Sequence, residues 1–170
     1  MPLLKDGRLA DDPWLTVADD EALPLGRYVI VTLDRWRAQR DTLVGRNGPL
    51  GLRLRSDQRP DEVAADLHHF DVIALEFPTF RDGRAYSTAR RLRERFGYRG
   101  ELRAVGNVLR DQWAFMRRCG FDAFEVERAD AERAWAESAG EIGVHYQPAA
   151  DRRPAAMALR RARGAPPIPS

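Results

Sequence analysis

Two turns of the chain carry residue types that bind anions or polar partners, and each turn lies between an apolar segment and a helical pattern. The first turn follows residues 71–77, and its candidate binding residues are Arg81, Asp82, Gly83, Arg84, Tyr86 and Ser87. The second turn follows residues 101–105 and offers Gly106, Asn107, Arg110, Asp111 and Gln112. Backbone amides at a helix start and planar arginine groups both bind carboxylate, sulfate or phosphate oxygens. We therefore predict that the two turns form an anion-binding or partner-binding site.

Proton transfer at such a site would require titratable side chains, and the candidates in or beside the turns are Glu76, Tyr86 and Asp111. Asp34 follows an earlier apolar segment, so an acid–base pair of Asp34 with Glu76 is a further hypothesis. The structural alternative is that Asp82 and Asn107 cap the helix starts while the arginines are solvated. Neither turn matches the glycine patterns of dinucleotide-binding or P-loop sites, and no cofactor is evident.

The other residues with possible chemistry receive structural interpretations. His68 and His69 come near the end of a predicted helix over residues 61–70, and no further ligands accompany them. We therefore expect surface histidines and no metal site. Cys119 is expected to be a small buried apolar residue. As the single cysteine, it also excludes an intrachain disulfide and a cysteine-rich iron–sulfur site built by this chain alone.

Apolar segments of strand length alternate with helical patterns from residue 28 onwards. The predicted strands are residues 28–33, 50–54, 71–77, 101–105 and 122–126, with a possible edge strand at 142–146, and the predicted helices are residues 61–70, 85–96, 108–118 and 131–138. Short connections between such elements favour a parallel sheet with right-handed crossovers. We predict an α/β fold of about five mainly parallel strands, arranged as a partial (β/α) barrel or an open sheet. The two turns should then line one edge of it.

Segments of different composition flank this predicted α/β domain, which spans residues 27–147. Residues 1–26 are predicted to form a small N-terminal β arm, with a hairpin turn at Asp6-Gly7 and with Trp14 and Leu15 directed toward a core. Residues 148–170 are rich in proline, alanine and arginine, and they are predicted to be a disordered tail.

The composition is that of an ordinary globular protein, with 44% apolar and 32% charged residues among 170. Lys5 is the single lysine among 28 basic residues. This preference for arginine suits the capture of oxyanions, or it reflects the codon usage of a GC-rich genome. The net charge of +2 gives no reason to expect a nucleic-acid partner. No apolar stretch has the length of a signal peptide or a membrane span, so we expect a cytoplasmic protein without a membrane partner.

The two turns also carry a family resemblance. The segments FPTFRDGRAYSTARRLRER and LRDQWAFMRRCGFDAFE resemble a bacterial family of unknown function, and the upstream LGLRLRSDQRPDEVAADLHHFDVIALEF fits the same pattern. The resemblance extends over roughly residues 1–146. The genes of this family commonly lie beside those of assimilatory sulfite reductase. Residues 99–126 are also similar to consecutive βα units of (β/α)8 barrels.

The family resemblance implies a role in assimilatory sulfate and sulfite reduction. We expect an accessory protein that binds sulfite reductase or an anionic intermediate. One alternative is a small enzyme, of the kind labelled an oxidoreductase, in which Arg84, Arg110 and Asp111 orient an anionic substrate. A second alternative is an interaction module that forms a homodimer.

Overall fold

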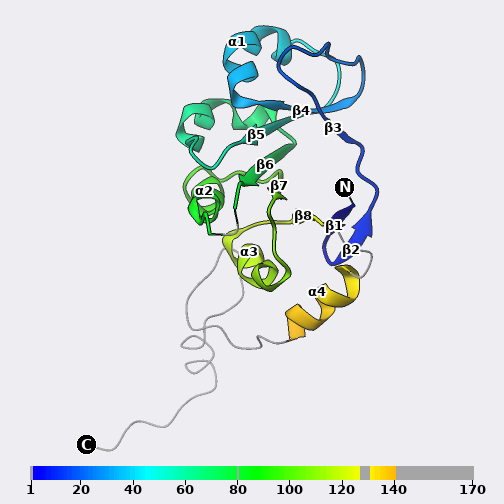
Figure 1. The fold of residues 1–170 in the computed structure, drawn as a ribbon. Coiled ribbons are helices and arrows are strands. Elements are labelled where there is room, and N and C mark those ends of the chain that lie inside the picture. The colour runs from blue at the N-terminus through cyan, green and yellow to red at the C-terminus, as the bar shows by residue number, and fades with distance from the viewer. Residues whose placement is uncertain (1, 80, 127–130, 141–170) are drawn as a thin grey trace, which may run out of the picture.

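The computed structural model describes residues 2–79, 81–126 and 131–140, and its centre is a single eight-stranded sheet (Figure 1). The strands are β1 (Leu3–Lys5), β2 (Arg8–Ala10), β3 (Trp14–Thr16), β4 (Tyr28–Thr32), β5 (Leu50–Leu54), β6 (Val72–Phe77), β7 (Glu101–Gly106) and β8 (Ala123–Glu125). The helical elements are α1 (Leu33–Val44), the 3-10 segment η1 (Pro60–His69), α2 (Arg84–Arg90) with a π-helical extension η2 (Arg91–Arg95), the 3-10 turn η3 (Arg110–Gln112), α3 (Trp113–Cys119) and α4 (Ala131–Gly140).

The sheet has the spatial order β2-β1-β8-β7-β6-β5-β4-β3. The strands from β3 to β8 pair in parallel, whereas β1 pairs antiparallel with both β2 and β8. The sheet is curled and open, as in a half-barrel. The predicted α/β fold with mainly parallel strands and an N-terminal hairpin is therefore confirmed. The parallel order also brings the ends of β4, β5 and β6 to one edge.

The two faces of the sheet have different coverings. Alternate strand residues, such as Val31, Leu52 and Leu75, pack with side chains from the helices in the main hydrophobic core. Figure 1 shows α1, α2 and α3 together on this side of the sheet. The opposite face, which we call the inner face, carries a smaller apolar cluster made of strand residues: Trp14, Ile30, Val72, Ala74 and Val105.

A short connection draws the two edges of the sheet toward each other. β2 and β3 lie at opposite ends of the strand order, yet only residues 11–13 join them. Four residue steps span at most about 14 Å, so the sheet has to curl for this connection to reach. We call residues 11–13 the strap. Figure 1 shows it running from β3 to β2 on the side of the sheet away from α1, α2 and α3.

Arg103, in the centre of β7, ties the strap to the inner face. Its Nη1 and Nη2 donate to the two carboxylate oxygens of Asp12 at 2.7 and 3.1 Å, and its Nε donates to Glu101 at 3.0 Å. Lys5 on β1 binds the other oxygen of Glu101 at 2.7 Å. Only 1% of the Arg103 side chain is exposed. A buried guanidinium therefore joins the strap, β7 and the N-terminal hairpin.

The five predicted strands are confirmed, but two predicted helices have another form. Residues 60–69 form a 3-10 segment instead of an α-helix. The helix predicted over residues 108–118 begins later, since Val108 N donates to Gly106 O at 2.9 Å and the chain passes through a 3-10 turn before α3. The possible edge strand at 142–146 and the predicted tail at 148–170 lie outside the described residues.

Two elements were missed by the sequence patterns. The helix α1 has few apolar residues, and it starts where the Thr32 hydroxyl accepts from Arg35 N at 3.0 Å. The strand β3 has only three residues. Trp14 packs against the inner-face cluster as expected, but the prediction for Leu15 is wrong because it lies on the sheet edge with 41% of its surface exposed. Among the described residues, no helix is long and apolar enough to cross a membrane.

Candidate functional site at the carboxyl edge of the sheet

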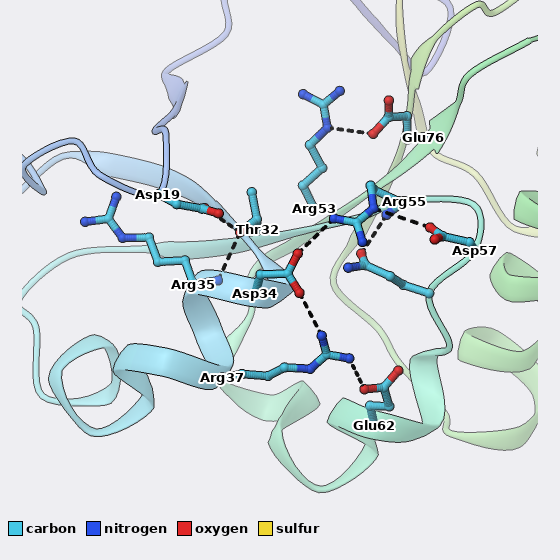
Figure 2. Close-up of polar contacts among 11 residues, drawn as sticks. Asp19, Thr32, Asp34, Arg35, Arg37, Arg53, Arg55, Asp57, Glu62 and Glu76 are labelled. Carbon is cyan, nitrogen blue, oxygen red and sulfur yellow. Dashed lines mark hydrogen bonds and ion pairs between the residues drawn. The ribbon is translucent and has the colours of Figure 1, made fainter.

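The carboxyl ends of β4, β5 and β6 carry a set of neighbouring charged and polar side chains that form three groups of contacts (Figure 2). We call this set the edge network, and its members are Asp19, Thr32, Asp34, Arg35, Arg37, Arg53, Arg55, Asp57, Glu62 and Glu76. They come from the ends of three neighbouring parallel strands, from the first turns of α1 and η1, and from the loops after β3 and β5. Ligands of open α/β sheets bind at this edge.

Asp34 is the centre of the edge network. It accepts from Arg55 Nη1 at 2.8 Å and from Arg37 Nη1 at 2.7 Å. Arg37 also pairs with Glu62, and Arg55 reaches Asp57 at 3.4 Å. The hydrogen bond from Arg55, followed by the nearby positive charges of both arginines, holds the pKa of the Asp34 carboxyl below its ordinary value. Asp34 is therefore a charged hydrogen-bond acceptor at neutral pH.

A second pair lies on the inner face beside this chain of contacts. Arg53 Nε donates to Glu76 Oε2 at 3.3 Å, and both side chains are partly exposed. Asp34 and Glu76, which the sequence suggested as an acid–base pair, thus bind different arginines. Figure 2 shows the arginine side chains of β5 and its following loop between the two carboxylates.

The loop after β3 is held against the same edge by Thr32 and Arg35. The Thr32 hydroxyl donates to Asp19 Oδ1 at 2.5 Å while it accepts from the α1 backbone. The buried guanidinium of Arg35 donates to Ala18 O and, at 2.7 Å, to Glu21 O. These contacts fix the backbone that carries Asp19, so the shape of the edge is set by side chains of α1.

The first predicted turn contacts the loop after β5, which also carries Arg55 and Asp57 of the edge network. Arg84 binds Asp82 through Nε and Nη2 at 2.9 and 2.6 Å, and its Nη2 also reaches Ser56 Oγ at 3.0 Å. Asp82 accepts from Arg84 N at 3.2 Å, but the expected N-cap role of Asp82 is wrong, because the N-cap of α2 is Gly83. The contacts from Arg84 and Ser56 hold the pKa of Asp82 far below its ordinary value. Arg81, Gly83 and Ser87 lie exposed around this pair.

Tyr86, in the first turn of α2, packs instead of facing the charged residues. Its ring makes edge contacts with Phe77 and Phe115, at centroid distances of 5.2 and 5.0 Å. Burial raises the pKa of the Tyr86 hydroxyl. The side chain therefore joins α2 to α3, and its proposed role in proton transfer gains no support from this position.

The second predicted turn begins beside the first and then diverges from it. Asn107 N donates to Phe77 O at 2.8 Å. Gly106 has φ +89°, and a Cβ at its position would lie 2.7 Å from Phe77 O, so the close approach requires glycine. Beyond this point Arg110 turns to Glu137 on α4. The expected N-cap role of Asn107 is wrong, because η3 begins after Leu109, where no side chain caps the helix.

The remaining predicted residues of the second turn stay apart from the edge network. Asp111 is exposed, and Gln112 is half-buried with its backbone N–H bound to Leu109 O at 3.1 Å. The structure therefore brings the backbones of the two predicted turns together at Phe77 and Gly106. Their arginines, Arg84 and Arg110, contact different parts of the molecule.

Sequence reasoning missed the arginines that follow the strand at residues 50–54. Arg55, Ser56 and Asp57 directly follow β5, as the predicted turns follow β6 and β7. The same rule about carboxyl ends would have found them. The edge network as a whole carries no excess of positive charge, since five carboxylates accompany four arginines among the side chains labelled in Figure 2.

His68 and Cys119 lie where they were expected, at the surface and in the core, whereas His69 is half-buried. His68 is exposed, and its ring lies 3.9 Å from that of His69. Within the described ranges, no group of three histidine, cysteine or acidic residues could hold a metal ion. Cys119 is buried in the main core, and burial raises the pKa of its thiol.

Comparison with known proteins places these residues in a family. The model of the DUF934 family, described as bacterial proteins of unknown function, matches residues 51–157. The chain belongs to this family. Curated proteins gave no match. The DUF934 match starts in β5, so it includes Arg53, Arg55 and Glu76, whereas Asp34 and the strap lie before it. The family resemblance had been expected to start near residue 1, and the match starts at residue 51.

The acidity of Asp34 tests whether the edge network forms in solution. Replacing Arg55 with methionine is expected to raise the pKa of the Asp34 carboxyl toward its ordinary value, because Arg55 contributes the strongest interaction that lowers it. The carboxyl of Asp34 has a lower pKa in the folded protein than in the unfolded chain, so its ionisation stabilises the fold at pH values above the unfolded-state pKa. This stabilisation is lost as the pH falls through the folded-state pKa. Carboxyl ¹³C titration by NMR measures the change. An unchanged titration in the Arg55→Met variant would contradict the contact.

Proposed function

We propose that this DUF934 protein is an accessory protein of assimilatory sulfite reduction that binds sulfite reductase through the edge network. The pathway is supported by the family resemblance and the genes that commonly accompany the family. The binding role is supported by one structural observation, which is the set of alternating arginines and carboxylates at the carboxyl edge of the sheet. The DUF934 match covers the members from Arg53 to Glu76 and does not include Asp34.

The composition of the edge network favours a protein partner over a free anion. Arg55, Arg37 and Arg84 each already bind a carboxylate of this chain, and the acids outnumber the arginines in Figure 2. A small anion would compete with these carboxylates and meet their repulsion. A protein surface can present charges of both signs, and it then gains specificity from electrostatic complementarity.

An enzymatic role has less support from the same geometry. A catalytic acid–base pair needs two titratable groups aimed at one reacting atom. Asp34 and Glu76 are instead held by Arg55 and Arg53, respectively. Asp111 lies apart from both. The enzyme therefore stays the alternative, and the test below has an outcome that would favour it.

The proposal predicts a complex between the purified protein and sulfite reductase of the same organism. We expect the two to co-elute in size-exclusion chromatography, and we expect a strain lacking the gene to need reduced sulfur for growth. The Arg55→Glu variant places a third negative charge beside Asp34 and Asp57 and should weaken binding about tenfold or more. The matched control is Arg40→Glu, because Arg40 pairs with Asp66 away from the edge network.

Three results would contradict the proposal in different ways. Normal growth of the deletion strain on sulfate would contradict a role in sulfate and sulfite reduction. A growth defect without any complex would favour the enzyme. A stable homodimer by light scattering, combined with no reductase binding, would favour the interaction module.

A further inference from the structure

Arg53 is a partly exposed arginine on the inner face, at the carboxyl end of β5. Its neighbours Leu52 and Leu54 belong to the main core, so the alternation of side chains along a strand turns Arg53 to the opposite face. Its register partners are Thr32 on β4 and Ala74 on β6, and neither is long enough to cover a guanidinium group. The side chain keeps 35% of its surface exposed. A partner can therefore reach it.

The guanidinium of Arg53 uses only part of its hydrogen-bonding capacity. Nε donates to Glu76, and Figure 2 shows both terminal nitrogens pointing away from the other side chains drawn. In the part of the chain that the structure describes, Nη1 and Nη2 have no hydrogen-bond partner. These two nitrogens form a planar fork that matches the two oxygens of a carboxylate.

Three other arginines of the sheet and its carboxyl edge each bind two carboxylates. Arg37 binds Asp34 and Glu62, and Arg55 binds Asp34 and Asp57. Arg103, further along the inner face, binds Asp12 and Glu101. Each of these three arginines contacts two carboxylates. Arg53 contacts one, so a second carboxylate would complete the same pattern.

We infer that the fork of Arg53 receives a carboxylate side chain from the protein that docks at the edge network. The inference rests on the proposed function, and it gives the partner an acidic residue at this point of the interface. A free oxyanion is disfavoured because Glu76 lies beside the fork and would repel it. A docked protein makes contacts elsewhere and excludes water, which strengthens a central arginine–carboxylate pair.

Affinity for purified sulfite reductase tests this role. The Arg53→Met variant should bind about tenfold more weakly or worse, because charge-assisted hydrogen bonds are lost. Arg53→Lys should be intermediate, since lysine keeps the charge without the fork. Arg40→Met is the control, because Arg40 pairs with Asp41 and Asp66 and belongs to no contact of the edge network, so the affinity of this variant should be unchanged. Calorimetric titration measures all four proteins.

Each outcome decides the inference. Equal affinity of the wild type and Arg53→Met overturns it and leaves the proposed function standing. No binding by the wild type overturns both. A rise in melting temperature with millimolar sulfite or sulfate that Arg53→Met loses would assign the fork to a small anion, and it would overturn the assignment to a partner. If Arg53→Met does not fold, Arg53→Lys decides, since equal affinity of Arg53→Lys and the wild type also contradicts a bidentate contact.

Discussion

Replacing Arg103 with methionine is expected to lower the free energy of unfolding by about 3 kcal/mol, because the partly exposed carboxylates of Asp12 and Glu101 lose their buried partner. Arg103 is almost fully buried, and it binds both oxygens of Asp12 as well as Glu101. The loss also releases the strap from the inner face. Urea denaturation monitored by tryptophan fluorescence measures the change.

The control for this prediction is Arg59→Met. Arg59 is 71% exposed on its side chain, and its nearest carboxylate is 3.9 Å away, so the free energy of unfolding should change by less than about 0.5 kcal/mol. The Asp12→Asn variant should be destabilised as well. The double variant Asp12→Asn with Arg103→Met should be less destabilised than the sum of the two single variants. Strict additivity would show that the contact between Asp12 and Arg103 does not stabilise the strap.

Replacing Arg93 with methionine is expected to cost about 2–4 kcal/mol of unfolding free energy, since several partly buried acceptors lose their donor at once. The Arg93 guanidinium donates to Tyr98 O at 2.7 Å, to Gly100 O at 2.9 Å, to Gly120 O at 3.0 Å and to Asp122 at 2.5 Å. It thus joins the loop before β7 to the loop before β8. Chemical denaturation at two pH values measures the effect.

The pH dependence distinguishes this effect from simple loss of packing. Burial raises the pKa of Asp122, and the charge of Arg93 opposes that rise. Without Arg93 the pKa of Asp122 in the folded state rises further. The Asp122 carboxyl then stays protonated to higher pH in the folded protein than in the unfolded chain. Stability is then lost as the pH rises through this interval. The variant should therefore be more destabilised at pH 7 than at pH 4, and an equal loss at both would contradict the role of Asp122.

The parallel sheet was predictable because its strands have strong local patterns. The β-branched segment at residues 28–33 and the apolar segment at residues 71–77 indicate buried strands from their local composition alone, without information from distant residues. The helix α1 was not predictable in this way. Its sequence LDRWRAQRDTLV has few apolar residues, and the helix is held by its cap at Thr32 and by the packing of Trp36 and Leu43 in the core.

The position of the candidate site was partly predictable, but its pairing was not. The rule that parallel strands end at one edge placed the turns after β6 and β7 together, and Gly106 does lie against Phe77. Which arginine binds which carboxylate depends on contacts between distant residues. Arg103 and Asp12 are 91 residues apart, and Asp34 and Arg55 are 21 apart. One sequence holds no local signal for such pairs.

The strand order has a consequence for the synthesis of the protein. Leu3 pairs with Glu125, so the first strand to leave the ribosome has to wait for nearly the last one before it can join the sheet. Contacts between residues so far apart in sequence slow folding, because a long loop must close first. The segment from β4 to β7 contains neighbouring strands that are consecutive in the chain, and it can form earlier. We therefore expect the N-terminal hairpin and the strap to join the sheet last, after the strands from β4 to β8 have paired.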